Sequence, residues 1–269
     1  MTSFYQVDPS VAEAYDRDGV VLLRNIIPEA PAIGRLHEAV ERILAEEKEG
    51  ARNYFKRLRM WERDPEFRAV LFESAVPIAA AQLLRTEKVN LLYDQLFVKE
   101  PGSNFPTPWH NDHPYWPVRG NQVVTLWIAL DKVTLANGGL EFVRGSHKQS
   151  KWYRPFSTDL SGDIVGQYQE GDVQFEDVPD IERNRDKFDV VSYDLNPGDA
   201  IAFHSLTLHG APGNTQSHAR RRALSIRMAG SDVVYYEGPV WNDDITNKTL
   251  KAGDPLDSEQ YPVLYRARA

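Results

Sequence analysis

Two helical patterns and a short apolar stretch occupy the first part of the chain. Residues 10–17 have the composition of a short helix, and apolar residues recur three and four positions apart between Pro28 and Gly50, as on the buried side of an amphipathic helix. The apolar residues 19–23, between these two helices, indicate a strand. A third helix is predicted over residues 65–84.

From about Lys88 onward the pattern changes to short segments rich in β-branched and aromatic residues, separated by Gly, Pro and Asn. Such segments are typical of strands joined by turns. We expect strands over residues 89–98, 123–130, 190–193, 199–204 and 223–228. The pattern therefore predicts a mainly β protein with helical additions (α+β).

No internal repeat, low-complexity tract or Gly/Ser linker divides the chain. We therefore expect one domain over residues 1–269, with residues 1–87 mainly a helical support and residues 88–269 a barrel. A polar stretch over about 146–187 has little periodicity and is longer than ordinary connections. It is interpreted as a lid-like insertion, with a surface insertion that has no role as the alternative.

Composition and charge exclude several classes of protein. The chain has 269 residues, of which 42% are hydrophobic and 26% charged, which excludes an intrinsically disordered chain. Its formal net charge is -8, and no uninterrupted run of basic residues is longer than residues 220–222. We expect no nucleic-acid partner, because such partners require an extended basic surface.

Three further absences limit the location and the chemistry. No apolar run approaches the roughly 20 residues that cross a bilayer, and the N-terminus lacks the features of a signal peptide. We therefore expect a cytoplasmic protein with no membrane contact; the sequence indicates no oligomeric state. The chain has no cysteine, so a metal would have to be held by His, Asp or Glu.

Three residues have the types and the order of a metal site. On an extended segment, residues two apart share a face, so His110 and Asp112 can present one imidazole nitrogen and one carboxylate oxygen to the same point. His209 ends a later predicted strand, before a Gly/Pro/Asn turn, and can supply a third ligand. Two His and one carboxylate leave coordination positions open for a 2-oxo acid and O2. The alternative is a set of polar residues at a barrel mouth.

Arg221 opens the strand that follows, where a guanidinium can bind the far carboxylate of 2-oxoglutarate through two hydrogen bonds.

Further motifs follow one another in a consistent order. They are Asp18-Gly19-Val20, Gln95-Leu96-Phe97-Val98-Lys99, Trp109-His110-Asn111-Asp112, Trp127-Ile128-Ala129-Leu130-Asp131, Asn137-Gly138-Gly139-Leu140, Gly145-Ser146-His147, Asn196-Pro197-Gly198-Asp199 and His209-Gly210. With them the sequence resembles the phytanoyl-CoA dioxygenase family of Fe(II)- and 2-oxoglutarate-dependent oxygenases over most of the chain. The resemblance implies a double-stranded β-helix, a jelly-roll (cupin-like) barrel with N-terminal helices packed on one sheet.

The resemblance also implies roles for the metal-site residues. The family's iron ligands fall on His110, Asp112 and His209. Its co-substrate arginine falls on Arg221, with Arg220 or Arg222 as alternatives because the loop here is one residue longer.

Three further residues match positions that line the 2-oxoglutarate pocket in relatives. They are Gln95, Trp127 and Lys56, the last in a region interpreted as helical. Packing in the core is the alternative for Trp127, and an exposed helix face is the alternative for Lys56. A Ser that the family often has two residues after its second His is Ala211 here.

The candidate substrate residues are mostly aromatic: Tyr93, His113, Tyr115, Trp116 and Phe142. Core packing is the alternative for the three that follow the iron motif directly. An aromatic wall favours a small organic substrate with apolar surface. The chain lacks a basic patch for the phosphates of coenzyme A, which favours a free small molecule over an acyl-CoA.

The implied reaction hydroxylates an unactivated C–H bond, with Fe(II), 2-oxoglutarate and O2 as cofactor and co-substrates and with succinate and CO2 as products. Asp112 favours hydroxylation, because the related halogenases have Ala or Gly at this position. Two alternatives use the same His/Asp/His set: a zinc hydrolase and a non-catalytic barrel that binds a metabolite. The zinc hydrolase gives Arg221 and Gln95 no role. Degenerate metal ligands would favour a non-catalytic barrel, but all three ligands are present here.

Overall fold

Most of the protein's strands belong to two antiparallel sheets. The computed structural model describes residues 5–28, 30–46, 53–155, 173–238 and 244–267. The large sheet has seven strands in the order β1 (Val20–Leu23), β11 (Ala200–His204), β6 (Val123–Ala129), β13 (Arg221–Ala229), β3 (Lys88–Lys99) and β15 (Val263–Arg266), with β2 (Tyr54–Leu58) also paired to β3. The small sheet has the order β10 (Val190–Ser192), β7 (Glu141–Val143), β12 (His209–Ala211) and β4 (Thr107–His110).

The two sheets pack against each other through aromatic side chains. The rings of Phe142 on β7 and Phe203 on β11 have centroids 5.1 Å apart. Two small sheets complete the pairing: β14 (Val234–Tyr235) with β5 (Val118–Arg119), and β8 (Trp152–Tyr153) in parallel with β9 (Phe175–Glu176). The short 3-10 helices are η1 (Met60–Glu62), η2 (His113–Tyr115), η3 (Leu135–Asn137), η4 (Ser146–Gln149) and η5 (Glu182–Lys187). The expected jelly-roll barrel is confirmed.

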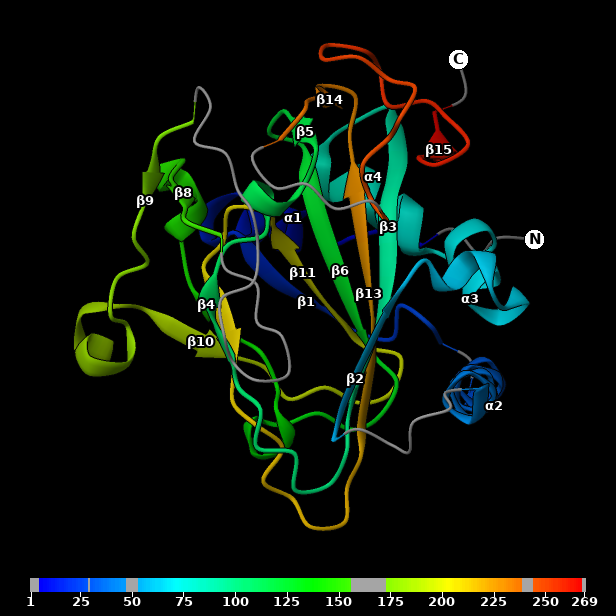
Figure 1. Cartoon of the computed structure of the whole chain (residues 1–269), viewed down its shortest axis with the longest axis vertical. Coiled ribbons are helices and arrows are strands. Elements are labelled where there is room, and N and C mark those ends of the chain that lie inside the picture. The colour runs from blue at the N-terminus through cyan, green and yellow to red at the C-terminus, as the bar shows by residue number, and fades with distance from the viewer. Residues whose placement is uncertain (1–4, 29, 47–52, 156–172, 239–243, 268–269) are drawn as a thin grey trace.

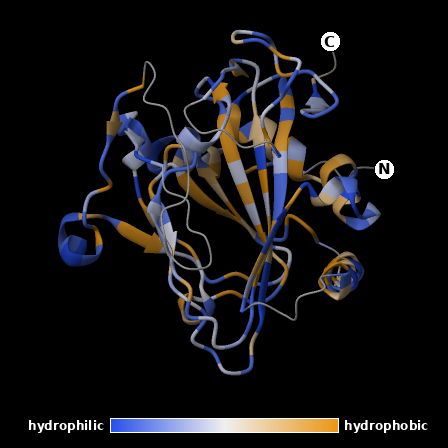
Figure 2. Ribbon diagram, in the orientation of Figure 1, coloured by the Kyte–Doolittle hydropathy of each residue, from blue (hydrophilic) through white to orange (hydrophobic). Residues whose placement is uncertain are grey.

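Helices cover the outer face of the large sheet. They are α1 (Pro9–Asp18), α2 (Ala30–Glu46), α3 (Pro65–Phe72) and α4 (Val76–Leu84), and in Figure 1 α2 and α3 lie on the side of this sheet away from β4 and β10. Side chains alternate along β13: Leu224, Ile226 and Met228 pack in the core shared with the helices, whereas Ala223 belongs to the core between the sheets. Figure 2 shows hydrophobic residues along the central strands β6, β11 and β13. The inner face of β13 is therefore free to carry polar groups into the barrel.

Local sequence explains how the first helix begins and ends. The Asp8 side chain accepts a hydrogen bond from the backbone N–H of Ser10, and Pro9 occupies the first turn, as is common at helix N-termini. Gly19 ends the helix with φ +73°, a conformation that favours glycine. A Cβ at this position would lie 2.3 Å from His147 Nδ1, so the Asp-Gly-Val motif also permits a close contact with η4.

The predicted helix over residues 65–84 is two helices, α3 and α4. The Ser74 side chain lies at the break, where it bonds the Val70 carbonyl and accepts from the Val76 N–H at 3.1 Å. Pro77, which lacks an N–H, lies in the first turn of α4. The stretch is also more apolar than the sequence interpretation allowed: it spans 20 residues, and an 18-residue window within it has a mean hydropathy of 1.4. However, 56% of the tested window is buried inside the protein, as in a core helix.

Residues 1–87 contain the helices α1 to α4 and two short strands, the expected β1 and the unexpected β2, which both belong to the large sheet. One expectation about this region needs correction. Residues 54–58, interpreted as helical, pair with β3 from Tyr54 opposite Lys99 to Leu58 opposite Gln95. Within the lid-like insertion, residues 156–172 lie outside the described residues, and the parts on either side contain η4, β8, β9 and η5.

Candidate metal centre

Two neighbouring strands of the small sheet bring the predicted histidines together. His209 on β12 is the register partner of His110 on β4, and their ring centroids are 4.2 Å apart. Beyond β4, the backbone N–H groups of Asp112 and His113 both donate to the Ser205 carbonyl, at 2.9 and 3.0 Å. This turn brings the Asp112 carboxylate back to the two imidazoles. One ligand atom from each of His110, Asp112 and His209 lies within 4.8 Å of the other two.

Hydrogen bonds orient all three side chains. His110 Nδ1 lies 2.8 Å from the Pro108 carbonyl and His209 Nδ1 lies 3.0 Å from the Thr207 carbonyl. A carbonyl only accepts, so each Nδ1 carries the proton and each Nε2 presents a lone pair, as in most metal-binding histidines. Asp112 Oδ1 lies 3.4 Å from His110 Nε2 and 3.8 Å from His209 Nε2. Thr125 donates to the other oxygen, Oδ2, at 3.4 Å.

The charge states also suit a metal ion. Burial raises the pKa of the Asp112 carboxyl, but His209, His110 and Arg227 together outweigh burial, so this pKa lies below its ordinary value. Burial, with His110 second, lowers the pKa of His209 to about 4. At neutral pH the pair therefore consists of a carboxylate and a neutral imidazole. These are the deprotonated forms that bind divalent metals.

Of the three neighbouring arginines, the structure turns one into the barrel. Arg220 pairs with Glu100 and Arg222 pairs with Asp131, and both also reach Glu41. Arg221 is 3% exposed, its Nε has no hydrogen-bond partner, and its Cζ lies 5.3 Å from the centroid of the Trp127 ring. Burial lowers the pKa of Arg221 to about 10, which leaves it charged. Among these three arginines, Arg221 is the one that is buried without an ion pair to a described carboxylate.

Lys99 is a second buried cation that the sequence interpretation missed as a site residue. It lies opposite Arg221 on β3, it is fully buried, and its Nζ donates to the Pro212 carbonyl at 2.7 Å. Burial, with Arg221 second, lowers the pKa of Lys99 to about 7. Gly138 makes room for this side chain: with φ +88°, a Cβ there would lie 3.0 Å from Lys99 Cδ and 3.1 Å from the Pro212 oxygen.

Two of the motifs that resemble the family could have indicated Lys99 as a site residue. They are Gln95 to Lys99 and Asn137 to Leu140, and the structure brings them together where Gly138 contacts Lys99.

The other expected co-substrate residues occupy two different environments. Gln95 and Trp127 lie on either side of Ser225 in the large sheet, with Trp127 buried and Gln95 half-buried. Lys56 is exposed on β2, opposite Phe97. It lies on a strand, not on a helix, and by alternation it shares a face with Tyr54, whose ring stacks on Phe97.

The expected substrate residues fall into two groups. Tyr93 lies on β3 opposite Arg227, and Tyr115 is half-buried with its ring edge-on to His110, 6.0 Å between centroids. Trp116 and Phe142 are buried against protein atoms, so the expectation that they line an open wall needs correction.

The two buried side chains support others. Trp116 Nε1 donates to the Tyr93 hydroxyl at 2.7 Å, and the Phe142 ring stacks on His209 with centroids 5.8 Å apart.

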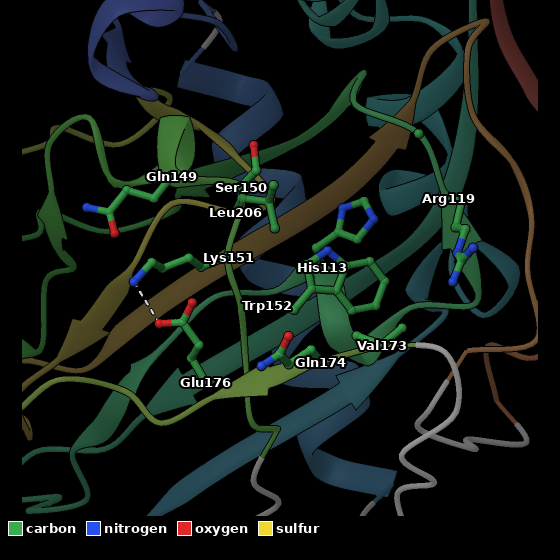
Figure 3. A pocket seen from close by; sticks show the side chains of 11 residues that line it. His113, Arg119, Gln149, Ser150, Lys151, Trp152, Val173, Gln174, Glu176 and Leu206 are labelled. Carbon is green, nitrogen blue, oxygen red and sulfur yellow. Dashed lines mark hydrogen bonds and ion pairs between the residues drawn. The ribbon is translucent and has the colours of Figure 1, made fainter.

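His113 faces away from the metal ligands. Its Nδ1 lies 2.8 Å from the Ser205 hydroxyl, and its ring lies 5.0 Å from the Trp152 ring. Both rings line a cavity of about 630 Å³ between η2 and β8, with the Lys151–Glu176 ion pair at its edge (Figure 3). None of the three candidate ligands lines this cavity, so His113 is corrected from a substrate residue of the metal site to a support of its loop.

Comparison with known proteins identifies the family. The model of the family "Phytanoyl-CoA dioxygenase (PhyH)" matches residues 15–223. A Caenorhabditis elegans protein described as a probable phytanoyl-CoA dioxygenase is 25% identical over 260 residues, which cover 82% of this chain and 75% of that protein. The peroxisomal phytanoyl-CoA dioxygenase of Bos taurus is 28% identical over 151 residues, but the match covers only 54% of this chain and 41% of the bovine protein.

Two solved structures have the same fold. The non-haem alpha-ketoglutarate-dependent carbocyclase SnoK from nogalamycin biosynthesis has a TM-score of 0.75 and 23% identity, covering 96% of both chains. The epimerase SnoN, in complex with Fe3+, alpha ketoglutarate and nogalamycin RO, has a TM-score of 0.72 and 20% identity, covering 96% of this chain and 100% of that one. This chain therefore belongs to the phytanoyl-CoA dioxygenase family, and it is a non-haem dioxygenase with the jelly-roll fold of 2-oxoglutarate-dependent oxygenases.

Proposed function

We propose that this protein uses Fe(II), 2-oxoglutarate and O2 to hydroxylate an unactivated C–H bond of a small organic metabolite. The observation that carries the proposal is the convergence of His110 Nε2, Asp112 Oδ1 and His209 Nε2 in a barrel that also contains the unpaired guanidinium of Arg221. Two histidines and one carboxylate are the donor set of non-haem Fe(II) oxygenases. The residues present therefore fit the iron that the family requires.

The proposed reaction has a simple balance. The bound iron, with 2-oxoglutarate and O2, supplies an oxidation in which the 2-oxo acid loses CO2 to become succinate, while the substrate C–H becomes C–OH. One oxygen atom of O2 enters succinate and the other enters the product. The protein's contribution is to bind, orient and exclude water.

Each polar residue of the site has a defined part. His110, Asp112 and His209 hold the ion from one side, with their geometry fixed by backbone carbonyls and by Thr125. Arg221 and Lys99 offer two buried positive charges to the far carboxylate of 2-oxoglutarate, and Trp127 supports the guanidinium through its ring face. Gln95, half-buried beside Ser225, is an additional donor for the same ligand.

Hydroxylation is the proposed outcome among several that this fold supports. The carbocyclase SnoK and the epimerase SnoN have the same fold, so the fold alone does not select the outcome. Asp112 favours hydroxylation over halogenation. The aromatic rings of Tyr93 and Phe97 inside the barrel support a substrate with apolar surface. A cytoplasmic location stays a prediction from the sequence.

An anaerobic titration tests the proposal. Fe(II) and 2-oxoglutarate, added to the metal-free protein, are expected to produce the weak visible charge-transfer band of an iron-bound 2-oxo acid. The band should be lost in His110→Ala and weakened in Arg221→Met, and Arg222→Met, which changes an outward-facing arginine, is the matched control. Tight zinc binding without any such band would favour the hydrolase. Absence of metal binding would favour a non-catalytic barrel.

A further inference from the structure

A second buried guanidinium lies on the inner face of β13. Arg227 is 6% exposed, its Nη1 donates only a long hydrogen bond to the Ser225 carbonyl, 3.3 Å, and its Nε has no hydrogen-bond partner. Within the described part of the chain, no carboxylate forms an ion pair with it. A guanidinium has five N–H donors, and the buried Nε–H of this one has no acceptor among the described residues. Such groups are costly unless a ligand completes them.

Three other arginines at the start of β13 show that pairing depends on the face of the sheet to which the side chain points. Arg220 and Arg222, which point outward, each form ion pairs with two carboxylates. Arg221 and Arg227, which point inward, both have an Nε without a partner. The inner face of β13 therefore carries two separate unpaired cations.

Arg227 lies at the level of the metal centre. In the register of the large sheet it is opposite Thr125 on β6, and Thr125 donates to Asp112. Arg221 is six residues away along the strand, about 20 Å between Cα atoms at the usual rise. Arg227 is therefore the arginine on the inner face of β13 that lies next to Thr125 and the metal ligand Asp112.

Two aromatic rings lie next to the guanidinium of Arg227. Arg227 Cζ lies 4.8 Å from the centroid of Tyr93 and 5.7 Å from that of Phe97. The Tyr93 hydroxyl is itself fixed by Trp116 Nε1. Rings occupy the faces of a guanidinium and leave its N–H edge for an acceptor. A carboxylate or a phosphate matches that edge through two parallel hydrogen bonds.

We propose that Arg227 anchors an oxyanion of the substrate, a carboxylate or a phosphate monoester, beside the metal centre. The apolar body of the same substrate contacts Tyr93 and Phe97. This inference rests on the proposed function and adds a substrate class to it: small anionic molecules with an apolar or aromatic body. Neutral metabolites of the same shape lack the group that Arg227 requires.

Binding of simple probes to the full chain tests this assignment. The probes are benzoate and phenyl phosphate, which separate the two kinds of oxyanion, and benzamide, which has the shape of benzoate without its charge. Calorimetry on metal-free protein should show at least one anion binding about tenfold more tightly than benzamide, a difference of about 1.4 kcal/mol. Arg227→Met should abolish this preference, and Arg227→Lys should keep part of it. Arg222→Met, which changes an outward-facing arginine paired with Asp131 and Glu41, should leave it unchanged.

Other outcomes would overturn the assignment. If benzamide binds as well as the anions, if no probe binds, or if Arg227→Met leaves anion binding unchanged, Arg227 does not anchor an oxyanion. If Arg227→Met weakens 2-oxoglutarate binding in the anaerobic titration as much as Arg221→Met does, Arg227 belongs to the co-substrate site. The probes need no iron, so failure of the iron titration would count against the proposed function without deciding the role of Arg227.

A stability measurement separates an anchor from a structural residue. Replacing Arg227 by Met removes the desolvation penalty of a buried cation, but it also removes the charge that helps to lower the pKa of Asp112. The two effects oppose each other, so the denaturation midpoint of Arg227→Met should stay close to that of the wild type. A lower midpoint together with unchanged anion binding would show a structural role and overturn the proposal. If Arg227→Met has both a lower midpoint and no anion binding, Arg227→Lys decides between the two roles. This variant keeps the positive charge and should keep part of the preference for anions. If it does not, the result counts against the proposal.

Discussion

Lys99 and Arg221 lie directly opposite each other on β3 and β13, and both side chains are buried. Neither forms an ion pair with a carboxylate in the described part of the chain. Two like charges in one buried place oppose each other, and the low pKa of Lys99 reflects burial and this neighbour. An anionic ligand removes the conflict. The place where these two side chains lie is therefore suited to an anionic group, as their proposed role with 2-oxoglutarate requires.

The affinity for 2-oxoglutarate is expected to depend on pH through Lys99. Its pKa without ligand is about 7, and an anion favours the charged form, so binding takes up a proton above that pH. Affinity should therefore fall as the pH rises from 7 to 9, up to about tenfold per pH unit. Lys99→Met should weaken binding about tenfold at pH 6 and remove the dependence. The anaerobic titration, repeated across this pH range, measures both effects.

The control for this prediction is the outward-facing Arg222→Met. It should keep the pH dependence of the wild type, because Arg222 pairs with Asp131 outside the barrel. An unchanged pH dependence in Lys99→Met would assign the titration to another group. An unchanged affinity in that variant would remove Lys99 from the co-substrate site.

Sequence alone predicted the sheet and the cluster of two histidines and one aspartate but not the buried cations. Residues 89–98 and 223–228 are long enough runs to indicate strands, and they are β3 and β13. His110, Asp112 and His209 were found because their types and order are specific. Lys99 was missed because a lysine at the end of an apolar run is typical of an exposed strand end. Its burial depends on β2 and on Pro212, both distant in the sequence.

Local signals also failed where short-range chemistry competes with periodicity. Residues 65–84 keep an apolar helical pattern across Ser74, whose hydroxyl bonds the backbone on both sides of the break. Residues 54–58 form a strand only because the free edge of β3 is beside them. In both places the decisive contacts are invisible to a count of hydrophobic positions.

Thr125→Val is expected to weaken metal binding without unfolding the protein. The two side chains have similar shapes, so the change mainly removes the hydrogen bond to Asp112 Oδ2, 3.4 Å in the structure. Loss of a group that orients a metal ligand typically costs about tenfold in affinity. A Co(II) titration monitored by visible absorption measures the change. Thr86→Val, which removes a hydroxyl far from the site, is the control, and equal affinities in both variants would leave Thr125 without an orienting role.

Gly138→Ala is expected to lower both stability and affinity for 2-oxoglutarate. Its φ of +88° is strained for Ala, and the new Cβ would lie 3.0 Å from Lys99 Cδ and 3.1 Å from the Pro212 oxygen. Gly253→Ala is a matched control, because its φ is +93° and nothing lies within 4 Å of its Cβ position. Both variants should lose about 1 kcal/mol of unfolding free energy. Only Gly138→Ala should weaken the co-substrate, and equal affinities would show that Lys99 tolerates the displacement.

His204 is expected to make the fold sensitive to mild acid. Its Nε2 lies 2.8 Å from the Asn121 carbonyl, and its Nδ1 accepts from the Leu206 N–H at 3.1 Å; burial, with His147 second, lowers its pKa to about 4. The unfolded side chain, with a pKa of about 6.5, takes up a proton first as the pH falls. Stability is therefore lost between about pH 6.5 and pH 4, by about 2 kcal/mol at pH 5. Urea unfolding at pH 7 and pH 5 measures the loss of unfolding free energy, which should be smaller in His204→Gln than in the wild type. His218→Gln, which changes an exposed histidine, is the control and should lose as much as the wild type. Equal losses in all three proteins would contradict the assignment.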